Sequence, residues 1–274
     1  MEADGSQVEH IPVLASVLTG QISIPQDGVM VDATIGHGGH ACLFGRNMDA
    51  EGTIVGLDVS QASIDVARSR LSDLPCKVVL LHENFSQIAT TMADIGIEKA
   101  DFILADLGLC SAQLSDPEMG LSFRANMPLD MRIDKRLETT AADIVNRADE
   151  TSLADLIYEF GQDRASRRIA RFIVSHRERE RITTTAQLAA IVCKALARPK
   201  QKKRQRIHPA TRTFQALRIA VNHELDSLKE LLSTAPGRLK AGGWLAVISY
   251  HSLEDKLVKD DFKQNKADGI YEVM

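Results

Sequence analysis

The chain has 274 residues, of which 44% are hydrophobic and 26% charged, and its net charge is −4. This composition is typical of a globular protein with a substantial core, and apolar runs such as Trp244–Ile248 are far too short to cross a bilayer. The four cysteines are scattered without paired spacing, which argues against a disulfide framework or a zinc knuckle and favours a reducing, cytoplasmic location.

The first informative stretch is Val31–His40 (VDATIGHGGH), where a short apolar run leads into a glycine-rich turn. Glycines let a ligand approach the backbone closely, and the first N–H groups of a following helix point into the same space. About 20 residues further on, the apolar run Thr53–Leu57 ends in Asp58. A carboxylate at the tip of a second strand is where nucleoside-binding Rossmann-like folds hold ribose hydroxyls. The glycine-rich turn and Asp58 together predict a nucleoside cofactor.

The first 110 residues alternate between strand-like and helix-like segments. Short runs rich in Val, Ile and Leu predict buried strands, and the segments between them carry apolar residues at helical spacing. The expected strands are Val29–Ala33, Thr53–Leu57, Lys77–Leu81 and Ala100–Ala105, and the expected helices are Ser60–Ser72 and Phe85–Ile95. This alternation predicts an α/β fold with a parallel sheet covered by helices on both faces.

The fourth expected strand also ends in a carboxylate, Asp106. Ligands of open α/β sheets lie beyond the carboxyl ends of the strands, so Gly36–Gly39, Asp58 and Asp106 should surround one crevice. An acid after the fourth strand lies close to the transferable end of a nucleoside cofactor. A turn or a helix cap is an equally common role for an Asp-Leu-Gly stretch. Only the position of Asp106 in this series favours the functional interpretation.

From about Pro117 to Arg206 the pattern becomes helical, with periodic segments at 139–146, 151–160, 163–179 and 184–197. Asp163–Arg212 carries 15 Lys and Arg against three acids, a local charge of +12, so the rest of the chain carries −16. Such segregation indicates a surface for a polyanion, with a solvated helix surface as the alternative. The run Arg198–Arg206 has no aromatic residue to stack bases, so it is expected to bind phosphates.

The strand signal returns at Trp244–Tyr250, after the helix candidate Ala210–Ser233 and the turn Ala241–Gly243. We therefore predict a Rossmann-like α/β domain interrupted by a helical insertion. The predicted boundaries place residues 1–116 and 207–274 in the α/β domain and residues 117–206 in the insertion.

Short motifs extend over nearly the whole chain: His10–Leu14, Asp32–His40, Asp106–Leu114, Gly120–Arg124, Pro128–Arg132 (PLDMR), Arg167–Ala170, Pro209–Glu224 (PATRTFQALRIAVNHE) and Ile248–Asp255 (ISYHSLED). In content and order they resemble the bacterial small-subunit (16S) ribosomal RNA cytosine-N4 methyltransferase family. PLDMR, TRTFQALRI and HSLED are rarely seen elsewhere. The resemblance implies a class I methyltransferase fold with a helical, RNA-recognising insertion. It also implies methyl transfer from S-adenosylmethionine to a cytosine N4 in the decoding region of the small ribosomal subunit.

The resemblance implies roles for individual residues near the cofactor. Gly38, Gly39 and His40 match the family's glycine turn against the methionine part of the cofactor, and Asp58 matches the acid that binds the ribose. Phe85 matches an apolar contact near the adenine. Asp106 and Gln113 match the family's remaining cofactor contacts.

Candidates for holding the target cytosine are Asp106, Asp130 in PLDMR, and His251 and Glu254 in HSLED. The exocyclic amine of cytosine is a poor nucleophile, so orientation beside the cofactor would supply most of the catalysis. A base inside folded RNA also has to leave its stack. The structural alternative is that PLDMR and HSLED hold the domain interface through buried ion pairs.

Three other interpretations bear on the sequence. We expect no metal site, because His37, His40, Cys42 and His82 match no zinc spacing. A nicotinamide-dependent oxidoreductase would use the same kind of turn and acid, but it would not explain the family motifs. A non-catalytic RNA- or ribosome-binding descendant is suggested by Cys110–Ala112, where the family has two serines and a proline, and by a C-terminus shorter than the family's. The sequence leaves open whether the protein forms a homodimer.

Overall fold

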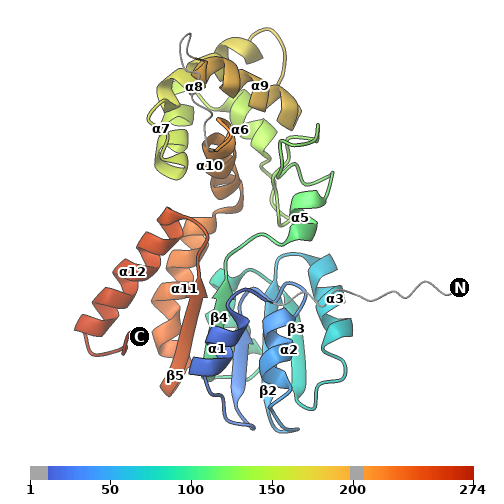
Figure 1. Ribbon diagram of the computed structural model, residues 1–274, viewed down its shortest axis with the longest axis vertical. Helices are drawn as coiled ribbons and strands as arrows, with labels where there is room; N and C mark the ends of the chain where they lie inside the picture. Colours follow the sequence, from blue (N-terminus) through green and yellow to red (C-terminus); the bar gives the residue numbers. More distant parts are fainter. Residues whose placement is uncertain (1–11, 198–206) are drawn as a thin grey trace, which may run out of the picture. The chain divides into compact units, whose positions relative to one another are not determined.

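The computed structural model describes residues 12–197 and 207–274, and the chain forms two compact units (Figure 1). The sheet unit comprises the residues up to Gly108 together with Ser227–Met274, and the helical unit comprises Leu109–Asp226. The basic run Arg198–Arg206 lies outside the described residues. No helix within the described ranges is long and apolar enough to span a membrane.

The sheet unit contains five parallel strands in the order β3-β2-β1-β4-β5. They are β1 (Val29–Asp32), β2 (Thr53–Asp58), β3 (Lys77–His82), β4 (Ala100–Asp106) and β5 (Leu239–Ile248). The chain moves outward from β1 to β3 and then returns to β4 on the other side of β1, so the strand order reverses between β1 and β4. Such a reversal creates the crevice in which open α/β sheets bind ligands. The predicted parallel α/β fold is confirmed.

Alternation along the strands gives this sheet two buried faces. Met30, Ile54 and Phe102 pack on one face against α1, α2 and α3. Val31 and Ile103 lie on the other face with residues of α4 and α11. The helices of this unit, with the 3-10 turn η1, are α1 (Ala15–Gln21), α2 (Gly39–Gly45), α3 (Gln61–Arg70), η1 (Phe85–Gln87), α4 (Ile88–Asp94), α11 (Glu224–Arg238, whose first turn belongs to the helical unit) and α12 (Ser252–Ala267).

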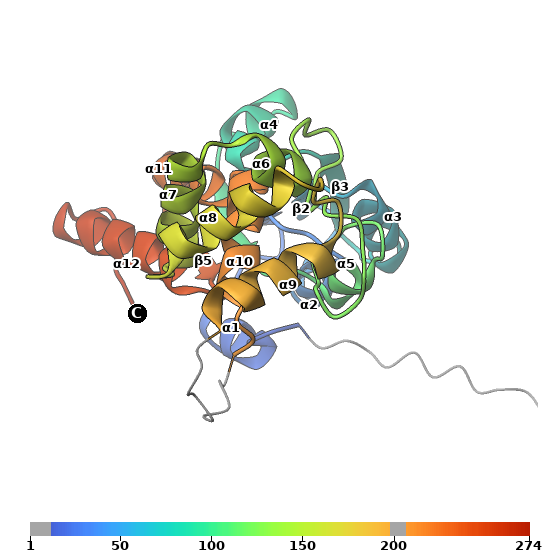
Figure 2. The same cartoon turned by 90° about the horizontal axis from the view of Figure 1, so that it is seen from above.

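The helical unit is built around a single apolar core. Its helices are α5 (Ser111–Ser115), α6 (Ala141–Arg147), α7 (Glu150–Gly161), α8 (Ser166–Arg177), α9 (Thr185–Leu196) and α10 (Thr211–Asn222). Helix α7 packs against both α8 and α10, and α8 packs against α9 (Figure 2). Capping boxes at Thr140 and Thr184 begin α6 and α9, since each threonine hydroxyl accepts a hydrogen bond from an N–H group of the first turn.

The second boundary between the units lies between Asp226 and Ser227, whereas the prediction placed it between residues 206 and 207. The difference is helix α10, which belongs to the helical unit. Its residues Phe214, Leu217 and Val221 are buried in the core of the helical unit, so packing assigns the helix to that unit. The predicted helix Ala210–Ser233 is in fact two helices, because His223 adopts a left-handed conformation with φ of 51° between α10 and α11. The first boundary falls after Gly108 rather than after residue 116.

Strand β5 begins five residues earlier than the expected strand Trp244–Tyr250. The predicted turn Ala241–Gly243 lies inside it, where Gly242 has φ of +78° and the register with β4 shifts between Ala100 and Phe102. The glycines therefore form a β-bulge and do not end the strand.

Candidate functional site

The glycine turn after β1 is tied to the end of β2 by Asp58. The Gly36 N–H donates to Asp58 Oδ2 at 2.9 Å, and the Ser60 N–H donates to Oδ1 at 2.8 Å. Each carboxylate oxygen keeps a further acceptor position for a ligand hydroxyl. Gly36 has φ of +48°, and a Cβ atom there would meet only Thr34 O at 3.8 Å, so the space beside this amide is open.

The neighbouring glycines serve close packing. Gly38 has φ of +75° and lies against the side chain of Leu71, and a Cβ atom on Gly39 would come within 2.8 Å of Pro12 Cγ. These contacts fix the path of the turn into α2. The path places His40 in the first turn of the helix, with only 6% of its surface exposed.

Asp106, at the end of β4, is bound to the same turn. Its N–H donates to the hydroxyl of Thr34 at 2.7 Å, and its Oδ2 lies 3.5 Å from His40 Nε2. Nδ1 of His40 is buried and has no hydrogen-bond partner among the described residues. A buried polar atom of this kind calls for a partner, and a polar ligand at the turn would provide one.

Burial and hydrogen bonding set different pKa values for the three acids at this edge. Burial alone would raise the pKa of Asp106, but hydrogen bonds from His40 and Tyr250 lower it below its ordinary value. Burial raises the pKa of Asp58 and outweighs the N–H groups of Ser60 and Gly36. Asp32, at the end of β1, is buried, and its pKa rises to about 7 despite the attraction of His40. Asp106 therefore supplies an ionised carboxylate at neutral pH, whereas Asp32 is partly protonated.

We expect Asp32→Asn to stabilise the protein above pH 7. The folded chain holds a proton on Asp32 up to about pH 7, whereas the unfolded chain loses it near pH 3.8, so stability falls as the pH rises through this window. The loss is about 1.4 kcal/mol per pH unit and is complete above pH 7. The amide removes this penalty and still accepts the bond from the Thr34 N–H.

Urea unfolding at pH 5 and pH 8 measures the effect, with the exposed Asp27→Asn as the matched control. The stabilisation by Asp32→Asn should be larger at pH 8 than at pH 5. An equal effect at both values would show that Asp32 is ionised in the folded protein throughout.

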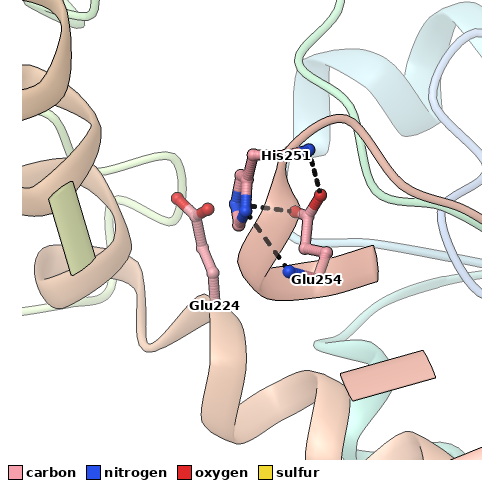
Figure 3. A group of neighbouring side chains, drawn as sticks. All are labelled: Glu224, His251 and Glu254. Atoms are coloured by element: carbon pink, nitrogen blue, oxygen red, sulfur yellow. Dashed lines mark hydrogen bonds and ion pairs between the residues drawn. The ribbon is translucent and has the colours of Figure 1, made fainter. Parts of the chain in front are cut away.

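In HSLED, the side chains of His251 and Glu254 cap α12 (Figure 3). Glu254 is 3% exposed, and its Oε2 accepts hydrogen bonds from the N–H groups of Tyr250 at 2.8 Å and His251 at 3.2 Å. His251 Nδ1 accepts in return from the Glu254 N–H at 3.3 Å. The two side chains thus hold the backbone after β5 in place, and their predicted contact with the cytosine stays a prediction.

In PLDMR, the charge of Asp130 is matched within its own loop. Arg132 Nε donates to Oδ1 at 2.7 Å and Lys135 Nζ donates to Oδ2 at 3.0 Å. Burial acts to raise the pKa of Asp130, but these cations lower it. Met131 is buried with φ of 66°, and Asn222 fixes it by donating to Met131 O and accepting from the Ile133 N–H. Asp130 is thus paired within its own loop of the helical unit, and both its catalytic role and the proposed interface role of PLDMR stay predictions.

The structure brings five of the predicted residues together in the sheet unit: Gly38, Gly39, His40, Asp58 and Asp106. Phe85 begins η1 in the same unit, where it is partly buried against the core on one face of the sheet. Gln113 and Asp130 belong to the helical unit, where Gln113 Oε1 accepts a hydrogen bond from the Cys110 N–H at 3.0 Å.

Three residues at the sheet edge carry no predicted role: Asp32, Thr34 and Tyr250. Asp32 and Thr34 stand inside the glycine motif, and Tyr250 stands just before HSLED. Their positions in these motifs are the signal by which a sequence could have indicated them.

Comparison with known proteins gives a consistent result. The model of the MraW methylase family matches residues 7–271. "Ribosomal RNA small subunit methyltransferase H" from Koribacter versatilis is 44% identical, covering 98% of this chain and 86% of that protein. The proteins of the same name from Acidobacterium capsulatum (44% identical; 97% and 89% covered) and Geobacter sp. (45%; 93% and 81%) are similar to the same extent. The chain therefore belongs to the MraW methylase family.

Proposed function

We propose that this protein transfers a methyl group from S-adenosylmethionine to the N4 amine of a cytosine in small-subunit ribosomal RNA. The observation that carries the proposal is the edge of the sheet where the glycine turn, Asp58 and the His40–Asp106 pair meet. This edge belongs to a chain that is 44% identical to ribosomal RNA small subunit methyltransferases H over nearly its full length.

The residues at this edge fit the proposed cofactor. The open space at Gly36 admits a ligand to the backbone, the free acceptor positions of Asp58 suit two ribose hydroxyls, and buried His40 Nδ1 needs a partner. Phe85 offers an apolar contact for the adenine. The bound cofactor supplies a methyl group on a sulfonium, which is a strong electrophile.

Asp106 has the properties needed to handle the amine of the base. The reaction forms an N–C bond as the S–C bond breaks, and the amine then releases one proton. The ionised carboxylate of Asp106 accepts a hydrogen bond from the amine before transfer and receives that proton afterwards. His40 and Tyr250 keep this carboxylate ionised and correctly oriented.

Exposed arginines of the helical unit support RNA as the substrate. Arg164, Arg167 and Arg171 are exposed at or near α8, within the segment of local charge +12. Guanidinium groups bind phosphates in two-point contacts, and such contacts release counterions and make affinity depend on salt. The partner would be the assembled or nearly assembled small subunit, which places the protein in the cytoplasm.

We expect Arg164→Gln combined with Arg167→Gln to weaken RNA binding and to reduce its salt dependence. Each lost phosphate contact should lower the slope of log affinity against log salt by about 0.7–0.9. Filter binding to small subunits between 50 and 200 mM salt measures the slope. Lys77→Gln with Lys99→Gln removes the same charge near the amino ends of β3 and β4 and should leave both quantities unchanged. Equal slopes in the two double variants would contradict an RNA-binding role for these arginines.

Methyl transfer from labelled S-adenosylmethionine to small subunits from cells lacking the family enzyme tests the function itself. Mass spectrometry of the digested RNA should find N4-methylcytosine in the decoding region. Cofactor binding without transfer to any RNA would instead favour the non-catalytic RNA-binding descendant, and transfer to a different atom or RNA would overturn the assignment of the substrate.

A further inference from the structure

Tyr250 lies where the pairing of β4 and β5 extends beyond both strands. Asp106 is in register with Ile248, and the Leu107 N–H donates to Ile248 O at 3.0 Å. Two residues further along, Tyr250 is opposite Gly108. A Cβ atom on Gly108 would come within 2.5 Å of Tyr250 Cε2 and 2.7 Å of Cζ, so the ring lies directly over the glycine. Only the missing side chain of Gly108 makes room for it.

Tyr250 is also held in place by its backbone N–H group and by its hydroxyl. The Tyr250 N–H donates at 2.8 Å to Glu254, whose carboxylate is buried in the cap of α12. The hydroxyl forms a hydrogen bond with Asp106. Despite these contacts Tyr250 keeps 52% of its surface exposed. One face of the ring is therefore fixed to the protein, and much of the rest is open to solvent beside the carboxylate of Asp106.

We infer that the exposed face of Tyr250 stacks on the target cytosine and holds its amine beside Asp106. The inference rests on the proposed function, because it names the group that receives the base at that site. A base taken out of its stack loses the contacts of its neighbours, and aromatic side chains replace them. A ring already held in position loses little conformational freedom when the base binds. Tyr250 is thus a positioning residue for the nucleotide, with Glu254 and Gly108 fixing its orientation.

Two substitutions separate the ring from the hydroxyl. Tyr250→Phe keeps the ring and removes the hydrogen bond to Asp106, so kcat for methyl transfer should fall, whereas KM for small ribosomal subunits should stay near the parent value because the stacking surface remains. Tyr250→Leu keeps an apolar group over Gly108 but removes the stacking surface, and kcat/KM should fall about 10- to 100-fold. The dissociation constant for S-adenosylmethionine, measured by calorimetry, should be the same in all three proteins.

Gly108→Ala provides a second, independent test. The added methyl group displaces the ring of Tyr250, so this variant should lose methyl transfer nearly as much as Tyr250→Leu does. In the Tyr250→Leu background the same change should cost little further activity, because displacing the leucine removes no stacking surface. Such non-additivity is the signature of two residues that act through one contact.

The outcomes are distinct. A Tyr250→Leu protein as active as the parent would overturn the inference, and so would a weakening of cofactor binding as large as the loss of transfer, since the ring would then contact the cofactor. A parent protein that makes no N4-methylcytosine would overturn the proposed function and this inference with it. Full additivity of Gly108→Ala and Tyr250→Leu would also contradict the inferred contact.

Discussion

Replacing Asp58 with alanine is expected to raise the dissociation constant for S-adenosylmethionine about 100-fold. The carboxylate accepts hydrogen bonds from the N–H groups of Gly36 and Ser60, so it orders the glycine turn, and its remaining acceptor positions are the ones that we propose for the ribose. A hydrogen bond to a charged group contributes about 1.5–3 kcal/mol, and about 1.4 kcal/mol corresponds to a tenfold change in affinity. The loss of the ribose contacts alone therefore accounts for most of the effect.

Calorimetry with the purified protein measures this affinity without any RNA. Asp65→Ala is the matched control, because Asp65 is an exposed acid of α3 in the same unit and accepts a hydrogen bond from Gln61, one helical turn away. The control should bind the cofactor as the parent does. If Asp58→Ala also binds with parental affinity, the ribose is held elsewhere and the assignment of Asp58 is wrong.

The sheet and its acids were predictable because each strand is a short apolar run ending in a distinctive residue. Thr53–Leu57 followed by Asp58 shows the pattern, since a buried parallel strand is apolar on both faces and polar residues gather where it ends. The edge of the sheet that carries the candidate site was therefore visible in the sequence before any contact was known.

The domain boundary was less predictable because packing decides it. Helical periodicity continues through Ala210–Ser233, and nothing local marks His223 as a break. The break is stabilised by Arg218, which binds Glu224 through two hydrogen bonds of 2.8 Å across the left-handed residue. The assignment of α10 to the helical unit depends on which core buries Phe214 and Leu217. Such contacts between distant residues leave no periodic signal.

The sequence also could not separate the roles of the polar residues within its motifs. Asp130, His251 and Glu254 stand in distinctive motifs, as Asp106 does, yet the structure pairs the first three within loops and caps. A motif contributes to a family resemblance whether its residues bind a substrate or cap a helix. Only the geometry shows that Asp106 is tied to the glycine turn through Thr34 and is partnered by His40.

Asp106→Asn is expected to lower kcat for methyl transfer about 100-fold or more while changing the cofactor dissociation constant only a few-fold. The amide has nearly the size of the carboxylate, but it cannot take the proton that the amine releases. Proton transfer to a positioned side chain typically contributes about 10²–10⁴ to a rate. Since His40 and Tyr250 lower the pKa of Asp106, the parent should keep its activity from neutral pH down to well below the ordinary range of His titration.

Single-turnover transfer to saturating small subunits isolates this step from binding and product release. Asp101→Asn is the control, because Asp101 is at the amino end of the same strand and its carboxylate binds the Val29 N–H and Lys240. This control should unfold at lower temperature yet transfer methyl groups at the parental rate when assayed well below that temperature. If Asp106→Asn keeps the parental rate, the proton leaves the amine directly to solvent, and Asp106 contributes only to the structure of the turn.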